Sequence, residues 1–271
     1  MMTFLSKLHV LSPVAEWDPK LALDFTTDFI PFSIVSSLIY ILGVVWLGQN
    51  VMRHRQPVNC DRLLVVWNGA LALFSTIGFF KLYGDMSSAL DNLGFLGSMC
   101  QNRTYYTDSV YGYWVLLFAV SKFFELGDTA FLVARKRPVI FLHWYHHALT
   151  FVITVITHTY QQAMVRWFIL MNFGVHSIMY TYFCVRALKI STPKVLSQTI
   201  TSLQILQFVV AIVNLAVLVG LKLTSSSVVT CNADWGILLA WCATYLSYLY
   251  LFSKFFYSSY MTPKSKSVKR E

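Results

Sequence analysis

The chain has 271 residues, of which 56% are hydrophobic and only 12% are charged, and its formal net charge is +9. A charged fraction about half that of an ordinary soluble domain excludes a water-soluble globular protein. The long apolar runs indicate an integral membrane protein, since a helix that crosses the hydrocarbon core needs roughly 20 apolar residues.

Seven apolar runs are long enough for spanning helices. In chain order they cover residues 29–52, 63–84, 111–134, 139–158, 163–187, 198–221 and 234–257. The fourth run is the weakest, because histidines interrupt it. The first run is longer than the core of a signal peptide, so we expect an uncleaved anchor. The sequence therefore predicts an all-α membrane protein with seven transmembrane helices.

Basic residues gather in every second connection. They are Arg53, Arg55 and Arg62 after the first helix, Arg135, Lys136 and Arg137 after the third, Arg186, Lys189 and Lys194 after the fifth, and Lys264, Lys266, Lys269 and Arg270 in the tail. Because Lys and Arg are retained on the cytoplasmic side, the C-terminus is predicted to be cytosolic and the N-terminus luminal. This asymmetry explains most of the net charge without nucleic acid, although anionic lipid or a phosphorylated substrate could exploit it.

Two features agree with this orientation. Asn102-Arg103-Thr104 is an N-glycosylation sequon in the predicted luminal connection between the second and third helices. Cys100 and Cys231 are the loop cysteines on that side, where an oxidising compartment permits a disulfide between them. Sequence gives no distance between two loops, so the pairing stays open at this point.

Four of the predicted helices carry polar stripes. The stripes are Lys122, Glu125, Asp128 and Thr129; His143, His146, His147 and Thr150; Asn172, His176 and Tyr180; and Ser197, Thr201, Gln204 and Gln207. Ionisable groups in spanning helices are rare and usually face the bundle interior. With a rise of about 1.5 Å per residue, each stripe lies roughly 10–15 Å from the cytosolic basic residues. The sequence therefore predicts one polar chamber that opens to the cytosol.

The clustered histidines first suggest a metal site. Membrane di-iron oxygenases need more ligands than this chain offers, because His9, His54 and His158 lie in a tail, a cytosolic loop and the luminal end of a helix. A single zinc ion is a further possibility. However, side chains at the adjacent positions 146 and 147 point about 100° apart on a helix. We therefore expect no metal.

The alternative is a reactive imidazole. A neutral imidazole can act as a nucleophile or general base, and a low-dielectric site favours the neutral form. His146 and His176 form the candidate pair, and Asn172 lies one turn from His176. The competing interpretation is that these histidines are satisfied by neighbouring carboxylates and only hold the bundle together. Their common depth with Glu125 and Asp128 favours the reactive site.

Four segments of the sequence resemble the signature motifs of the ELO family of very-long-chain fatty acid elongases, the 3-ketoacyl-CoA synthases of the endoplasmic reticulum. In order, they are KFFELGDT (122–129), HWYHH (143–147), HSIMYTYF (176–183) and TSLQILQ (201–207). The resemblance extends from about residue 30 to 260. The family's third motif usually ends in two tyrosines, whereas this one ends in Tyr182-Phe183, which puts a role for the final position in doubt. The HWYHH form resembles the branch that acts on saturated and monounsaturated chains.

The resemblance implies that acyl-CoA condenses with malonyl-CoA, with loss of carbon dioxide, to give a 3-ketoacyl-CoA two carbons longer. It also implies six helices around a narrow acyl-chain tunnel with the remaining helix outside. The expected domains are a luminal segment (1–28), the seven-helix elongase domain (29–258) and a basic cytosolic tail (259–271). No cofactor is expected, because the CoA thioesters are substrates. Expected partners are membrane lipid, other enzymes of the elongation cycle and a second copy of the chain.

The resemblance also assigns roles to residues. His146 would carry the acyl group as an acyl-imidazole, His176 with Asn172 would stabilise the enolate, and His143 and His147 would support the site. The residues expected to bind substrate are Lys122, Glu125, Asp128, Arg135, Lys136, Arg137, Tyr180, Tyr182, Gln204 and Gln207. Cys100 and Cys231 resemble a pair that is bridged in the family. Two rival functions remain, a seven-helix ligand-binding receptor or transporter and a His-cluster membrane oxidase.

Overall fold

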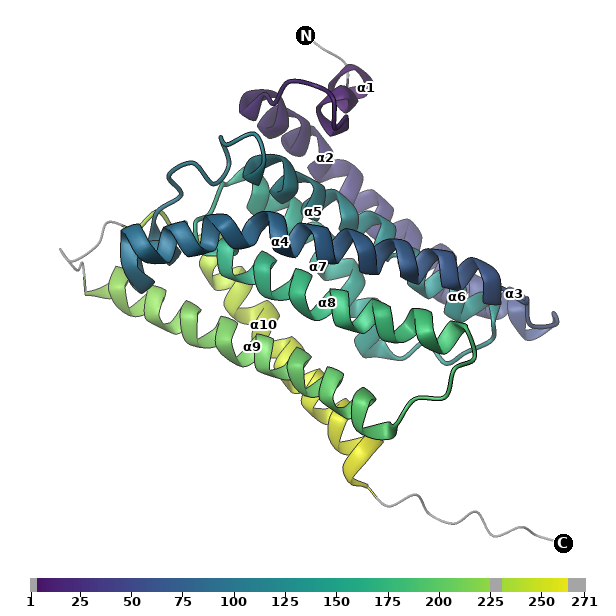
Figure 1. Ribbon diagram of the computed structural model, residues 1–271. Coiled ribbons are helices and arrows are strands. Elements are labelled where there is room, and N and C mark those ends of the chain that lie inside the picture. Colours follow the sequence, from purple (N-terminus) through teal and green to yellow (C-terminus); the bar gives the residue numbers. More distant parts are fainter. Residues whose placement is uncertain (1–3, 225–230, 263–271) are drawn as a thin grey trace, which may run out of the picture.

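The computed structural model describes residues 4–224 and 231–262, and within them every regular element is helical (Figure 1). The basic residues from Lys264 to Arg270 lie outside the described residues. The elements are α1 (Phe4–Lys7), η1 (Leu8–Leu11), α2 (Pro19–Ile39), η2 (Tyr40–Gly48), α3 (Gln49–Arg53), α4 (Asp61–Cys100), α5 (Tyr111–Glu125), α6 (Gly127–Ala134), α7 (Phe141–Thr159), α8 (Val165–Ala187), α9 (Lys194–Leu223), α10 (Trp235–Phe256) and η3 (Tyr257–Met261).

The first long helix begins at Pro19, well before the predicted residue 29, and continues through η2 and α3 to Arg53. Asp18 caps it, because its carboxylate accepts hydrogen bonds from the backbone N–H groups of Lys20 (2.9 Å) and Leu21 (3.1 Å). Pro19 occupies the first turn, where its missing N–H costs nothing. Local capping therefore sets the start of the helix, and the apolar run alone places it too late.

Helix α4 is much longer than the predicted run of 63–84 and ends at Cys100. The acidic Asp85 does not end it, because the Arg166 guanidinium pairs with that carboxylate at 2.6 Å in the interior. A kink at Gly94, with φ of 65°, redirects the last turns. Cys100 is thus the last residue of a helix, and the prediction that it lies in a loop is wrong.

The predicted helix 111–134 is two helices, α5 and α6, separated at Leu126. The backbone tightens there, since Leu126 N donates to Phe123 O and Thr129 N donates to Leu126 O, both at 3.3 Å and both three residues apart. Lys122 and Glu125 thus lie before this break and Asp128 lies after it.

Six helical segments pack side by side in a closed order. Helix α4 packs on α8, α8 on α9, α9 on α10, α10 on α7, α7 on α5, and α5 on α4. Helix α2 lies outside this ring and packs mainly against α7 (Figure 1). Close approach of α4 and α8 depends on Gly78, because a Cβ there would lie 2.6 Å from Cζ of Phe173. The interior of the ring is where a site can form.

The two ends of the bundle differ in chemistry. The basic end contains α3, the end of α6 and the start of α9, which lie together with the last described residues of the chain (Figure 1). The other end, called the disulfide end here, contains a Cys100–Cys231 bond with a Cα–Cα distance of 4.2 Å. Asn102 lies beside it. The Nδ2 atom that would carry a glycan donates to the carbonyl of Gln161, and Oδ1 is buried. Glycosylation stays a prediction.

Five helices of the described part are long and apolar enough to cross a membrane, so the chain is a multi-pass membrane protein. They are Pro19–Arg53, Asp61–Cys100, Val165–Ala187, Lys194–Leu223 and Trp235–Met261. The break at Leu126 leaves α5 and α6 each too short by this criterion, and four histidines lower the hydropathy of α7. The remaining two predicted spans thus fall short for different reasons, α5 and α6 because each is short and α7 because of its histidines.

Candidate active site

The three histidines of HWYHH lie in the first two turns of α7. The ring centroid of His147 is 4.5 Å from that of His143 and 5.4 Å from that of His146. The three imidazoles thus lie close together at the start of α7. Within residues 4–224 and 231–262, no group of three or more His, Cys, Asp or Glu side chains is arranged to hold a metal ion.

Two cavities occupy the interior of the ring. The large cavity has a volume of about 840 Å³ and opens toward the basic end, while the narrow cavity, of about 40 Å³, extends toward the disulfide end. Four residues line both, and they are His146, Asn172, Gln207 and Phe208. A molecule that occupied both cavities would pass this junction.

His146 is half-buried at the junction. Its ring lies 4.8 Å from that of Tyr248 and 5.8 Å from that of Phe252, centroid to centroid, and its backbone carbonyl accepts a hydrogen bond from Tyr248 Oη at 3.3 Å. Among the described residues its imidazole has no hydrogen-bond partner, although His143 Nε2 lies 2.9 Å from Thr129 Oγ1. Of these two histidines, His146 alone keeps both ring nitrogens available to a molecule in the cavities.

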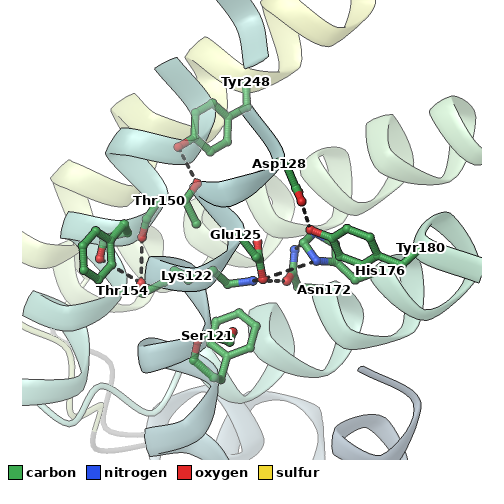
Figure 2. A network of polar contacts seen from close by, with 12 residues as sticks. Ser121, Lys122, Glu125, Asp128, Thr150, Thr154, Asn172, His176, Tyr180 and Tyr248 are labelled. Carbon is green, nitrogen blue, oxygen red and sulfur yellow. Dashed lines mark hydrogen bonds and ion pairs between the residues drawn. The ribbon is translucent and has the colours of Figure 1, made fainter. Parts of the chain in front are cut away.

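His176 belongs to a closed network with Lys122, Glu125 and Asn172 (Figure 2). Lys122 Nζ donates to Glu125 Oε1 at 2.6 Å and to Asn172 Oδ1 at 3.0 Å. Because Lys has no acceptor, the Asn172 amide must present its oxygen to Lys122 and its Nδ2 to His176 Nε2, 3.1 Å away. His176 Nδ1 then carries the proton and faces Glu125 Oε1 at 3.7 Å. The buried Lys122 cation thus fixes the orientation of the Asn172 amide and the tautomer of the His176 imidazole.

Asp128 binds different partners from those of Lys122 and Glu125. Its carboxylate accepts hydrogen bonds from Trp67 Nε1 at 2.6 Å and from Tyr180 Oη at 2.8 Å, and the second of these is drawn in Figure 2. These contacts join α4, α6 and α8. Asp128 and Tyr180 line the large cavity, as do Gln204 and Gln207 from α9. With His143, His146 and His147 of α7, side chains from all four predicted stripes thus line one cavity.

Four predicted substrate-binding residues lie elsewhere. Lys122 and Glu125 are 3% and 4% exposed and line neither cavity, so they lie behind the residues that form the cavity lining. Lys136 points to another part of the basic end, where it donates to the carbonyls of Arg53 (3.4 Å) and Arg55 (3.2 Å). Tyr182 also lies outside both linings, whereas Phe183, the position that lacks the family's second tyrosine hydroxyl, lines the large cavity.

The mouth of the large cavity is basic. Arg135, Arg137, Arg186 and Lys189 line it together with Asp61. Asp61 is 3.2 Å from Arg135 Nη2 and 3.0 Å from Lys189 Nζ, so one carboxylate holds two cations in place. This arrangement would suit a polyanionic group that enters from the basic end.

Several residues of the site escaped prediction. Tyr40 Oη is 2.6 Å from Thr129 Oγ1, which in turn contacts His143, and Trp67 and Tyr248 make the contacts described above. In the sequence, nothing separates these three from the many aromatic residues that fill a bundle or lie at a membrane interface. Only the four-residue spacing of Thr244 and Tyr248 on one helix could have marked Tyr248 as part of a polar face.

The fold and the site define a multi-pass membrane protein with a buried histidine centre between a polar cavity and a narrow one. Residues 25–268 match the model of the family described as ELO: GNS1/SUR4 family, and the chain belongs to this family.

Similar curated proteins come from distant organisms. The chain is 43% identical to long chain fatty acid elongase 2 of Caenorhabditis elegans, over 91% of this chain and 90% of that protein. It is 37% identical to very long chain fatty acid elongase 3 of Homo sapiens, over 90% and 88% of the two chains. Fatty acid elongase 3 of Trypanosoma brucei brucei is 32% identical, over 86% and 85%.

Proposed function

We propose that this protein catalyses the decarboxylative condensation of a long-chain acyl-CoA with malonyl-CoA. As a member of the ELO family it is a condensing enzyme of fatty acid elongation. The position of His146 carries the mechanistic part of the proposal, because its unpaired imidazole lies where the two cavities meet. The narrow cavity would hold the acyl tail, and the large cavity would hold the CoA part.

Binding follows from the chemistry of each cavity. A volume of about 840 Å³ suits a cofactor-sized group, and the cations at its mouth suit the phosphates of CoA. The small bore of the narrow cavity and its many apolar and aromatic lining residues suit an alkyl tail better than a headgroup. The thioester carbonyl would then lie at the junction, beside His146 and Asn172.

In the proposed mechanism, an imidazole nitrogen of His146 attacks the thioester carbonyl and CoA leaves as the thiol. Malonyl-CoA then enters the large cavity and loses carbon dioxide. The resulting enolate attacks the acyl carbon, the imidazole leaves, and a 3-ketoacyl-CoA two carbons longer is released. Asn172 and His176, held by Lys122 and Glu125, would stabilise the enolate oxygen. His143 and His147 would shape the pocket around His146.

We also propose that α5–α6 and α7 cross the membrane, so that seven helices span it and six surround an acyl tunnel. The order in which the six segments pack against one another around the ring supports this arrangement. The basic end would face the cytosol and the disulfide end the lumen of the endoplasmic reticulum, in accord with the distribution of Lys and Arg. The reaction uses the side chains named here and needs no cofactor.

Mass spectrometry would test the acyl-imidazole. Purified protein incubated with acyl-CoA alone should gain one acyl group on the segment 143–147, and added malonyl-CoA should convert it to 3-ketoacyl-CoA with release of carbon dioxide. The variant His146→Ala should show neither result. The variant His54→Ala is the matched control, because that imidazole lies in an exposed connection. Condensation by His146→Ala would contradict the role of His146, and acyl-CoA binding without any condensation would favour a receptor or transporter.

A further inference from the structure

The far end of the narrow cavity contains a histidine that the proposed reaction does not use. His158 lies near the end of α7, is 5% exposed, and lines the cavity together with Tyr106, Thr157 and Trp241. Its ring packs edge-on against Tyr106, 5.5 Å between centroids. A buried imidazole at the end of this slot needs a physical explanation, because a buried polar atom is costly unless it is hydrogen-bonded.

The tautomer of His158 follows from its neighbour on α2. His158 Nδ1 is 3.1 Å from Thr26 Oγ1. A threonine hydroxyl in a helix ordinarily donates to a carbonyl three or four residues earlier, and the carbonyls of Ala22 and Leu23 lie 3.0 and 3.1 Å from Thr26 Oγ1. Thr26 therefore accepts from His158, so Nδ1 carries the proton. In the neutral ring, Nε2 is then an acceptor.

Nε2 of His158 is buried and has no partner in the described part of the chain. Because Thr26 lies on α2, outside the helical ring, Nδ1 faces outward. The two nitrogens of an imidazole point in divergent directions, so Nε2 faces the narrow cavity that His158 lines. The structure thus presents one unpaired hydrogen-bond acceptor to the end of the slot.

Hydrogen bonds tie together the connections around the end of the slot. Tyr106 Oη donates to the carbonyl of Gln162 at 3.0 Å, and Gln162 Oε1 accepts from the backbone N–H of Asp234 at 2.8 Å. The disulfide joins the same connections, and Asn232 N donates to Cys100 O at 2.8 Å. We take these connections as the limit for a chain that enters from the junction, so such a chain would end near His158.

The depth of the slot gives the length of that chain. His146 and His158 are 158 − 146 = 12 residues apart on α7, which corresponds to about 18 Å of helix. An extended alkyl chain advances about 1.25 Å per carbon, from a C–C bond of about 1.5 Å and a bond angle of about 111°. About 14 carbons therefore separate a carbonyl at His146 from a chain end at His158.

We infer that the end of the narrow cavity is a polar subsite for a hydroxyl group at the distal end of an acyl chain of about 14 to 16 carbons. A methyl end leaves Nε2 of His158 without a partner, whereas an O–H donates to it. The face of α7 along the slot supports entry of such a chain, because Thr150, Thr154, Thr157 and His158 all line it. The inference rests on the proposed function, since it takes the chain to be an acyl-CoA.

Competition between matched substrates would test the subsite. Acyl-CoAs of about 12 to 18 carbons, each with and without a terminal hydroxyl, are condensed with malonyl-CoA, and the ratio of kcat/KM for the two forms is measured at each length. The wild-type ratio should peak at about 14 to 16 carbons and favour the hydroxylated chain about threefold to tenfold, the size of one net hydrogen bond. His158→Phe should abolish this peak, and His158→Gln, which keeps an acceptor, should retain part of it.

The ratio is taken within each variant, so a general loss of activity cancels. A wild-type ratio of one or less at every length would overturn the subsite and assign Nε2 to a buried water molecule. A peak that survives in His158→Phe would overturn it equally. Binding of the same acyl-CoAs is also measured without malonyl-CoA. If no acyl-CoA is condensed, the proposed function fails, and the binding ratio still decides whether the subsite recognises the hydroxyl.

Discussion

At the scale of single residues, one buried cation orders the site. Lys122 touches neither cavity, yet it sets the orientation of the Asn172 amide and through it the tautomer of His176. Its charge is balanced by Glu125, and both side chains are buried. Such a pair contributes little net stability, but loss of one partner leaves an uncompensated charge in a low-dielectric interior.

We therefore expect Lys122→Met to lower the free energy of unfolding by about 3–5 kcal/mol. The double variant Lys122→Met with Glu125→Gln should recover a large part of that loss, because no isolated charge remains. Its condensation rate should stay low, since Asn172 has lost the donor that orients it. Equilibrium unfolding in mixed micelles and a condensation assay check both points, and equal unfolding free energies for the single and double variants would contradict the pairing argument.

Two cations that are neighbours in sequence, Lys136 and Arg137, lie differently at the basic end. Arg137 lines the cavity, whereas Lys136 binds backbone carbonyls of another connection. We expect Arg137→Ala to raise KM for acyl-CoA about threefold to tenfold with little change in kcat, as for loss of a partly exposed charge-assisted hydrogen bond. Lys136→Ala is the matched control and should leave KM unchanged. Steady-state kinetics at two salt concentrations would test this. An equal rise in KM for both variants would show that only the overall positive charge matters, and not a contact made by Arg137.

At the scale of elements, the break between α5 and α6 places two acidic residues in different networks. Glu125 ends one helix and pairs with Lys122, while Asp128 begins the next and reaches Trp67 and Tyr180. The break also lets Gly127 pack directly on the Trp67 ring, because a Cβ would lie 2.8 Å from Cζ2 of that ring.

Gly127→Ala should therefore displace Trp67 and weaken its hydrogen bond to Asp128. The expected loss is about 1–3 kcal/mol in the free energy of unfolding, as for overpacking, together with a lower kcat. Gly220→Ala on α9 is the matched control, because no atom lies within 4 Å of a Cβ there. That variant should be neutral or more stable by up to about 1 kcal/mol, from the helix propensity of alanine. Similar losses for both variants would contradict the packing argument.

At the scale of the whole molecule, the ring of helices is closed at the disulfide end by connections that are far apart in sequence. The Cys100–Cys231 bond spans 131 residues, and Arg166 binds the carbonyls of Ser98, Gln101 and Asn102 beside it. These contacts hold the connection after α4, whose Tyr106 lines the narrow cavity. A fixed end of the narrow cavity would limit the length of the acyl chain that the cavity accepts.

We expect Cys231→Ser to lower the free energy of unfolding by about 2–5 kcal/mol, because the bond closes a long loop in the unfolded chain. The measurement is unfolding of detergent-solubilised protein, with and without reductant. Cys60→Ser is the control, since Cys60 is a free thiol in a connection at the basic end. Reductant should destabilise the wild type and leave Cys231→Ser unaffected. A wild type indifferent to reductant would contradict the role of the bond.

The sequence by itself determined the class of the molecule and the depth of its chemistry. Apolar length and the placement of Lys and Arg are local properties, so they predict helices, and helical rise then places His143, His146, Asn172, His176 and Gln204 at one level. The motifs were sufficient to indicate the family. The helix boundaries were less predictable, since a buried partner such as Arg166 for Asp85 can carry a helix past a charge.

Only the tertiary structure decided which of these residues meet. The partners of Asp128 after the break at Leu126, the contact of Tyr40 with Thr129 and the place of Lys122 behind the cavity lining depend on packing between distant segments. The same holds for His158, because its free acceptor follows from Thr26 on a helix outside the ring. Spacing along one helix carries no information about such partners, since they are set by how the helices pack.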